Sequence, residues 1–164
     1  LLAPALVGAG LNPLGSHLFI LYWGMLSYIT PPVALAAITA AGVAGANSTL
    51  TSLHAVRLGA VLFVLPFLFV LNPSLILQGP LLGVLTSALT AMTAIWLVAA
   101  AMEGYLYRIG AVGVSIRCML LVPAALMIYP EWVSDVVGFI ALLLCYLVAM
   151  LKSTKRAHIP KYPV

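Results

Sequence analysis

A polar interruption lies inside a long apolar stretch, where the chain reads Ser27-Tyr28-Ile29-Thr30-Pro31-Pro32-Val33-Ala34. In a continuous helix, residues 31 and 32 would donate hydrogen bonds to the carbonyls of Ser27 and Tyr28, but proline has no N–H to donate. Free backbone polar groups are tolerated at membrane depth only where they face a cavity or other protein. The segment therefore predicts a broken helix that presents polar groups to a ligand.

The end of the first half-helix predicts a cation site. The carbonyls of Ser27 and Tyr28 are expected to be free, and the hydroxyl of Thr30 is close to them in sequence. Neutral oxygens at the negative end of a helix dipole suit a hard cation. Ser27, Tyr28 and Thr30 are therefore candidate ligands of Na⁺, and no organic cofactor is expected.

The start of the second half-helix predicts a carboxylate site. Because Pro32 suits the first turn of a helix, the N–H groups of Val33, Ala34 and Leu35 are expected to point unpaired into the gap. Thr30, Pro32, Val33 and Ala34 are the candidate substrate-binding residues. A cation site and an anion site on the two sides of a broken helix are typical of ion-coupled carriers.

A plain proline kink is the alternative interpretation of this segment. In that case the Thr30 hydroxyl would bond back to a carbonyl of the preceding turn. Ala37, Ala41 and Gly45 follow at four-residue spacing, which predicts close approach of another helix to the second half-helix. The residues alone leave the binding site and the kink both open.

The composition predicts an all-α integral membrane protein. Hydrophobic residues make up 65% of the 164 residues and charged residues 6%, and the mean hydropathy is +1.22. Apolar stretches divided by turn-forming residues predict about five crossings, one of them broken. Because the chain opens on Leu1 without an initiator methionine, we expect a C-terminal fragment of a larger unit. The expected helices cover residues 1–7, 14–29, 33–45, 51–71 with a kink at Pro66, 80–102, 114–129 and 136–151.

The positions of Lys and Arg predict the orientation. The basic tail contains Lys152, Lys155, Arg156 and Lys161 and is expected in the cytoplasm, where these residues accumulate. Counting back through five crossings places residues 103–108 and 47–57 inside, and residues 131–135, 72–78 and 8–13 outside. Because the basic cluster follows a hydrophobic span, lipid is the expected partner and nucleic acid is not.

The other ionisable residues favour membrane boundaries over catalysis. His17, His54 and Arg57 are expected to be boundary residues, whereas Glu103 and Arg108 are expected to pair across a turn. The remaining acids are Glu131 and Asp135, and Asp135 is expected near the start of the last helix, where negative charge is favoured.

Arg117 and the two cysteines lie within apolar segments. Arg117 is either a functional intramembrane charge or a side chain that reaches back to the cytoplasmic boundary. Cys118 and Cys145 are expected to act as small hydrophobic residues. The sequence shows neither a buried nucleophile with a base nor clustered metal ligands, so an intramembrane enzyme is not predicted.

The first half of the chain resembles the last third of the large membrane subunit of tripartite ATP-independent periplasmic (TRAP) transporters, and is most similar to the TAXI-type fused permeases. The segments that carry the resemblance are His17-Leu18-Phe19, Leu26 through Ala37, Ala40 through Ala46, Arg57-Leu58-Gly59 and Pro66 through Pro73. From Gly79 to Lys152 the chain is more weakly similar to the C-terminal helical extension of those permeases.

The resemblance implies three regions and an elevator-type secondary transporter. Residues 1–77 would be the C-terminal part of the large permease domain, with a hairpin end at 1–10 and the second broken helix at 27–34. Residues 78–152 would be a three-helix membrane extension, and residues 153–164 a cytoplasmic basic tail. Many relatives have glycine where this chain has Ser27.

The function that the resemblance implies is cation-coupled import of organic acids across the bacterial inner membrane, by symport usually with Na⁺. Its implied partners are a periplasmic solute-binding protein and the remainder of the permease, including the small-subunit-like helices. The alternative is a structural membrane subunit without a binding site of its own.

Overall fold

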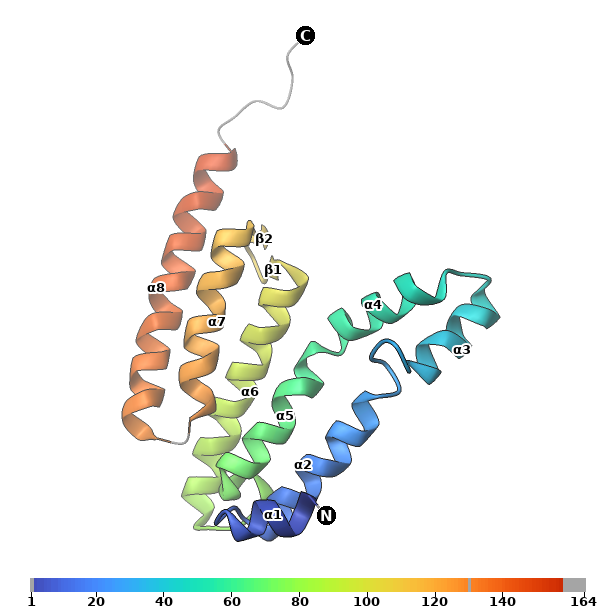
Figure 1. Cartoon of the computed structure of the whole chain (residues 1–164). Helices are drawn as coiled ribbons and strands as arrows, with labels where there is room; N and C mark the ends of the chain where they lie inside the picture. The colour runs from blue at the N-terminus through green and yellow to red at the C-terminus, as the bar shows by residue number, and fades with distance from the viewer. Residues whose placement is uncertain (1, 130, 158–164) are drawn as a thin grey trace.

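The computed structural model describes residues 2–129 and 131–157, and this part of the chain is almost entirely helical (Figure 1). The fold class predicted from composition, an all-α membrane protein, is confirmed. The elements are α1 (Leu2–Gly8), α2 (Pro13–Leu26), α3 (Leu35–Ala44), α4 (Ser48–Leu58), α5 (Ala60–Leu71), a 3₁₀ helix η1 (Pro73–Ile76), α6 (Leu81–Glu103), β1 (Tyr105–Leu106), β2 (Gly110–Ala111), α7 (Val114–Ile128) and α8 (Trp132–Ala157).

Helix α2 begins at a capped proline and packs closely on α5. Asn12 is the N-cap, its side-chain oxygen accepts a hydrogen bond from the Gly15 N–H at 3.1 Å, and Pro13 occupies the first turn. A Cβ placed on Gly15 would lie 2.8 Å from the Phe69 carbonyl oxygen, so the two backbones meet where only glycine fits. Further along, Phe19 stacks edge-on against Phe67 with ring centroids 5.2 Å apart.

The helix after Asn47 is bent at a different place from the one predicted. Helices α4 and α5 meet at Gly59 with an angle of 43° between them, whereas α5 continues through Pro66 without ending. Glycine has a poor helix propensity, and Gly59 also lies against Ile29, whose Cδ1 would be 2.8 Å from an added Cβ. The contact between neighbouring segments therefore sets the position of the bend.

Helices α6, α7 and α8 form the best-buried part of the described chain. Helix α7 packs against both α6 and α8, and Leu97, Leu120 and Ala149 are completely buried among them. The connection between α6 and α7, of which residues 103–108 were expected on the inner side, contains a short antiparallel ribbon, β1 paired with β2, which the sequence did not predict. Cys145 is buried in this core, as expected of a small hydrophobic residue, whereas Cys118 is exposed.

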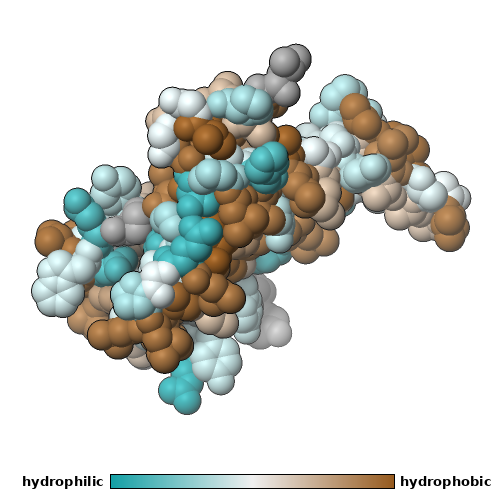
Figure 2. All heavy atoms as spheres, turned by 90° about the horizontal axis from the view of Figure 1, so that it is seen from below, coloured by the Kyte–Doolittle hydropathy of each residue, from teal (hydrophilic) through white to brown (hydrophobic). Residues whose placement is uncertain are grey.

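Within the described residues, fewer helices are long enough to span a membrane than the five crossings that were predicted. Helix α6 and residues Trp132–Leu151 of α8 are long and apolar enough to cross a membrane, and the bent pair α4 and α5 makes a third if counted as one. Helices α2 and α7 have 14 and 15 residues, which at a rise of about 1.5 Å per residue is less than the roughly 30 Å of a bilayer core. Viewed from below in Figure 2, apolar residues cover large continuous areas of the surface.

Two contacts agree with the predicted grouping of connections by side. Arg57 and Glu103, both expected inside, form an ion pair at 3.1 Å. Asn12 and Gln78, both expected outside, are joined by a hydrogen bond of 2.5 Å from the Asn12 amide to the Gln78 side-chain oxygen. The expected tail begins as a continuation of α8 through Ala157, and His158 and Lys161 lie outside the described residues.

Candidate functional site: the broken helix

The interruption predicted at the double proline is present and is longer than expected. Helix α2 ends at Leu26, and α3 begins only at Leu35. Pro32 is therefore not in the first turn of the second half-helix, as the sequence predicted. The residue before α3 is Ala34, which has a left-handed backbone conformation with φ 37° and is almost fully buried.

The two ends at the break satisfy each other in part. The Ala36 N–H donates to the Tyr28 carbonyl at 3.0 Å, and the Ala34 N–H donates to the Thr30 carbonyl at 3.0 Å. Two expectations are therefore wrong: the Tyr28 carbonyl and the Ala34 N–H are not free. The physical reason is that the chain folds back over residues 30–34, which brings the positive end of one half-helix onto the negative end of the other.

Both hydroxyls at the break donate to the end of α2. The Thr30 hydroxyl donates to the Leu26 carbonyl at 2.7 Å, and the Ser27 hydroxyl donates to the Gly24 carbonyl at 2.7 Å. Back-bonding of Thr30 is what the kink interpretation predicted. Because both hydroxyl protons are already in hydrogen bonds, the two hydroxyl oxygens can act toward a ligand only through their lone pairs.

Some polar backbone groups at the break have no partner within the described residues. They include the carbonyls of Ser27, Pro31 and Pro32 and the N–H groups of Val33 and Leu35. The side chains of Tyr28 and Val33 are 52% and 50% exposed, so the segment lies at the surface of this chain. The break therefore retains oxygens before and at the double proline, and N–H groups after it, that remain open to a ligand.

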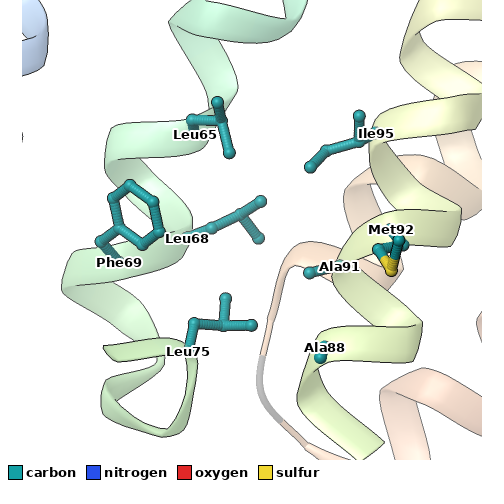
Figure 3. Close-up of a pocket in the computed structure, with 8 residues that line it drawn as sticks. All are labelled: Leu65, Leu68, Phe69, Leu75, Ala88, Ala91, Met92 and Ile95. Carbon is teal, nitrogen blue, oxygen red and sulfur yellow. The ribbon is translucent and has the colours of Figure 1, made fainter. Parts of the chain in front are cut away.

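A cavity of about 260 Å³ lies beside the break. Its walls are almost entirely apolar, and they are formed by Tyr22, Met25, Leu26, Tyr28, Ile29 and Leu62. A second cavity of about 180 Å³ lies between α5 and α6, and its eight labelled side chains are all apolar (Figure 3). Neither cavity by itself has the polar lining that an organic acid requires, because a buried carboxylate needs hydrogen-bond donors.

The small residues of α3 lie where close packing was predicted. Ala37 and Ala41 are buried, and α3 packs against α4. Gly45 ends the helix instead of packing, with a left-handed backbone at φ 64°. The packing holds α3 and α4 together as a hairpin that begins immediately after the break.

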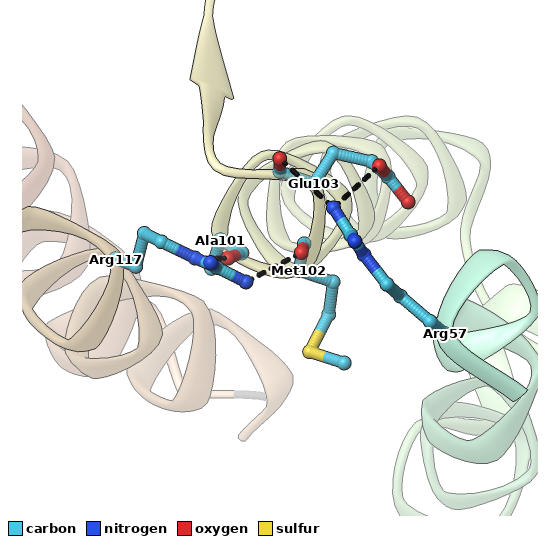
Figure 4. A network of polar contacts seen from close by, with 5 residues as sticks. All are labelled: Arg57, Ala101, Met102, Glu103 and Arg117. Carbon is cyan, nitrogen blue, oxygen red and sulfur yellow. Dashed lines mark hydrogen bonds and ion pairs between the residues drawn. The ribbon is translucent and has the colours of Figure 1, made fainter. Parts of the chain in front are cut away.

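Arginine side chains contact the C-terminal end of α6, and the sequence did not predict these contacts. Arg57 pairs with the Glu103 carboxylate, so the predicted pairing of Glu103 with Arg108 is wrong. Arg108 instead lies over the Tyr107 ring. Arg117 donates hydrogen bonds of 2.6 Å to the carbonyls of both Ala101 and Met102 (Figure 4). Arg117 thus caps a helix C-terminus, where positive charge is favoured.

Apolar helices that pack into a bundle, two or three of them long enough to cross a membrane, define an all-α membrane protein. Residues 1–84 match the family model described as tripartite ATP-independent periplasmic transporter, DctM component. The chain belongs to this family, and it is a transporter component and not an enzyme. Comparison with curated proteins gave no match, and comparison with solved structures gave none.

Proposed function

We propose that this chain forms half of a cation and carboxylate site in a secondary transporter that imports organic acids. The observation that carries the proposal is the break at residues 27–34, which interrupts a helix within the part of the chain that matches the family. Discontinuous helices of this kind are where carriers bind solutes and coupling ions. The coupling ion is Na⁺, and a periplasmic solute-binding protein delivers the acid.

The proposed cation ligands are Ser27, Tyr28 and Thr30. Each hydroxyl proton of Ser27 and Thr30 is committed to α2, which leaves the oxygen lone pairs for a cation. The Tyr28 carbonyl accepts one hydrogen bond and has a second lone pair. Oxygen ligands without formal charge suit a weakly bound monovalent cation that must be released in each transport cycle.

The proposed substrate contacts come from Thr30, Pro32, Val33 and Ala34. Within this set, the Val33 N–H has no partner among the described residues, and the N–H of Leu35 adds a second donor at the start of α3. Donors at the N-terminal end of a helix favour a carboxylate. The remaining contacts would come from the rest of the permease.

Uptake by the full-length transporter tests this proposal. Vesicles that contain all its components are given a panel of radiolabelled mono- and dicarboxylic acids, with an inward Na⁺ gradient or with choline in place of Na⁺. We expect Na⁺-dependent uptake, reduced at least about tenfold by Thr30→Ala. Thr39→Ala is the matched control, because Thr39 makes the same bond to the carbonyl four residues earlier but lies within regular α3. Uptake that survives both Na⁺ replacement and Thr30→Ala would contradict the proposal.

A scaffold role is the second candidate, for the extension at residues 78–152. Its helices α6, α7 and α8 share a core that lies mostly beyond the family match, and α6 also packs on α4 and α5. Deletion of residues 80–164 is expected to reduce the amount of assembled permease in the membrane and, in proportion, the uptake. Normal assembly with lost uptake would count against a role limited to scaffolding.

A further inference from the structure

A shallow groove of about 260 Å³ lies where α6 meets the ribbon that follows it. Its lining residues are Trp96, Ala99, Ala100, Glu103, Tyr105 and Tyr107. The first four occupy positions i, i+3, i+4 and i+7 of α6 and so share one face of the helix, and the two tyrosines come from the ribbon. All six lie beyond the residues that match the family, so the groove is separate from the half-site at residues 27–34.

The polar end of this groove combines aromatic rings with a carboxylate. The rings of Trp96, Tyr105 and Tyr107 are all exposed, and the face of such a ring attracts a cation. The Glu103 carboxylate accepts a hydrogen bond from Arg57 through Oε2, whereas Oε1 accepts none within the described residues. Aromatic rings beside an available carboxylate oxygen suit an ammonium group that can donate a hydrogen bond.

Arginine side chains place positive charge next to the same end of the groove. Arg57 donates to Glu103 only through Nη2, so its other guanidinium nitrogens remain available (Figure 4). Arg108 lies 5.8 Å from the centroid of the Tyr107 ring and has no ion pair within the described residues. Guanidinium groups bind phosphate through their N–H groups. Positive and negative charge side by side therefore complement a ligand that carries both a phosphate and an ammonium group.

The groove changes from polar to apolar along the helix axis. Helix α6 is long enough to cross a membrane, and Glu103 is its last residue. Trp96 lies seven residues earlier, which at about 1.5 Å per residue places it roughly 10 Å closer to the bilayer core. A small soluble amine would use only the polar end. An amphiphile matches the whole groove, and aromatic residues at this depth are typical of the membrane boundary.

We infer that this groove binds one phosphatidylethanolamine molecule of the leaflet that faces the cytoplasm. Its ammonium group contacts Glu103 Oε1 and the aromatic rings, its phosphate contacts Arg57 and Arg108, and its glycerol and first acyl carbons follow α6 toward Trp96. The choline group of phosphatidylcholine has no N–H to donate to the carboxylate, and phosphatidylglycerol has no cationic group. The inference does not require a cation at the break.

Native mass spectrometry of the delipidated full-length permease tests this site. The protein is titrated with phosphatidylethanolamine, phosphatidylcholine and phosphatidylglycerol that have identical acyl chains. We expect the first phosphatidylethanolamine to bind at least about fivefold more tightly than either other lipid, because only its headgroup both donates to Glu103 and contacts the rings as a cation. Equal affinities for the three lipids, or a preference for phosphatidylglycerol, would overturn the inference.

Substitution of the carboxylate tests the ammonium contact. Glu103→Gln keeps an oxygen that can accept from Arg57 but removes the negative charge, so it is expected to abolish the preference for phosphatidylethanolamine. The matched control is Glu131→Gln, an exposed acid at the other end of the extension, which is expected to keep the preference. A preference that survives in Glu103→Gln, or that is lost equally in Glu131→Gln, would overturn the inference.

A pair of variants at Tyr105 tests the ring contact. The Tyr105 side chain is 61% exposed, so neither variant removes a buried group. Tyr105→Leu is expected to weaken phosphatidylethanolamine binding, whereas Tyr105→Phe keeps a ring and is expected to bind like wild type. Trp132→Leu removes an exposed ring at the opposite end of the extension and is expected to have no effect. Wild-type binding in Tyr105→Leu, or equal losses in Tyr105→Phe or Trp132→Leu, would contradict the ring contact.

Discussion

At the scale of single residues, hydroxyl protons committed to helix carbonyls recur along this chain. Thr30, Ser52 and Thr39 each donate to the carbonyl four residues earlier. This bonding satisfies a hydroxyl in an apolar environment without a partner from another helix. At the break it has a further consequence, because the oxygen of Thr30 is then oriented as an acceptor beside polar backbone that the prolines have released.

Ser16 departs from this pattern and yields a stability prediction. It is completely buried, and its hydroxyl has no hydrogen-bond partner within the described residues. A buried unpartnered hydroxyl costs stability, whereas removing a bonded one loses about 1 kcal/mol. Ser16→Ala is therefore expected to be more stable than Ser52→Ala by about 1 kcal/mol. The measurement is thermal unfolding in detergent, and the reverse order of melting temperatures would contradict the prediction.

At the scale of elements, the sequence predicted most helices and not the links between them. Helix α6 begins and ends within a residue of its prediction because Pro80 and Gly104 are strong boundary signals. The break is longer than predicted. The effect of Pro31 and Pro32 on the helix can be predicted from their neighbours in sequence, but the left-handed backbone of Ala34 depends on how the chain folds back. The bend at Gly59 was missed for a similar reason, since it depends on contact with Ile29 across the fold.

The same limit applies to the candidate site. The double proline located the interruption from sequence. The known effects of proline on a helix do not predict that the Ala36 N–H donates to the Tyr28 carbonyl. The Arg57–Glu103 pair spans 46 residues of sequence. A signal for it existed, because Glu103 is the one acid in the connections assigned to the inner side.

The α2–α5 contact gives a prediction at the element scale. A Cβ on Gly15 would lie 2.8 Å from the Phe69 carbonyl oxygen and 3.3 Å from the Val70 Cα, both backbone atoms that cannot turn aside. Gly15→Ala is expected to destabilise the fold by about 1 to 3 kcal/mol. Gly24→Ala, in the same helix with nothing within 4 Å, is expected to be neutral or slightly stabilising. Equal unfolding temperatures for the two variants would show that the helices do not approach as described.

At the scale of the whole molecule, the chain consists of a family-matched part and a C-terminal extension that packs on it. The match covers residues 1–84, and α7 and α8 lie wholly beyond it. The Arg57–Glu103 ion pair joins the two parts at one end of the molecule, and the bond from Asn12 to Gln78 lies at the other end, within the matched part. We expect these two contacts to lie at opposite faces of the membrane.

Cysteine labelling tests that arrangement. In cells with a permeable outer membrane and a Cys118→Ser, Cys145→Ala background, a membrane-impermeant maleimide is expected to label Gln78→Cys. It is expected to label Tyr107→Cys, which is exposed on the loop between β1 and β2, only after the cells are lysed. This pattern follows if the connections with Arg and Lys are cytoplasmic. Labelling of Tyr107→Cys in intact cells with protection of Gln78→Cys would invert the orientation.

The proposed transport function depends most on whether the break binds a cation. Equilibrium binding of ²²Na⁺ to the purified full-length permease measures this directly, in wild type, Thr30→Ala, Thr30→Ser and Thr39→Ala. We predict that Thr30→Ala weakens binding at least about tenfold, which corresponds to roughly 1.4 kcal/mol, while Thr30→Ser and Thr39→Ala bind like wild type. Wild-type affinity in Thr30→Ala, or equal losses in Thr30→Ala and Thr39→Ala, would contradict it.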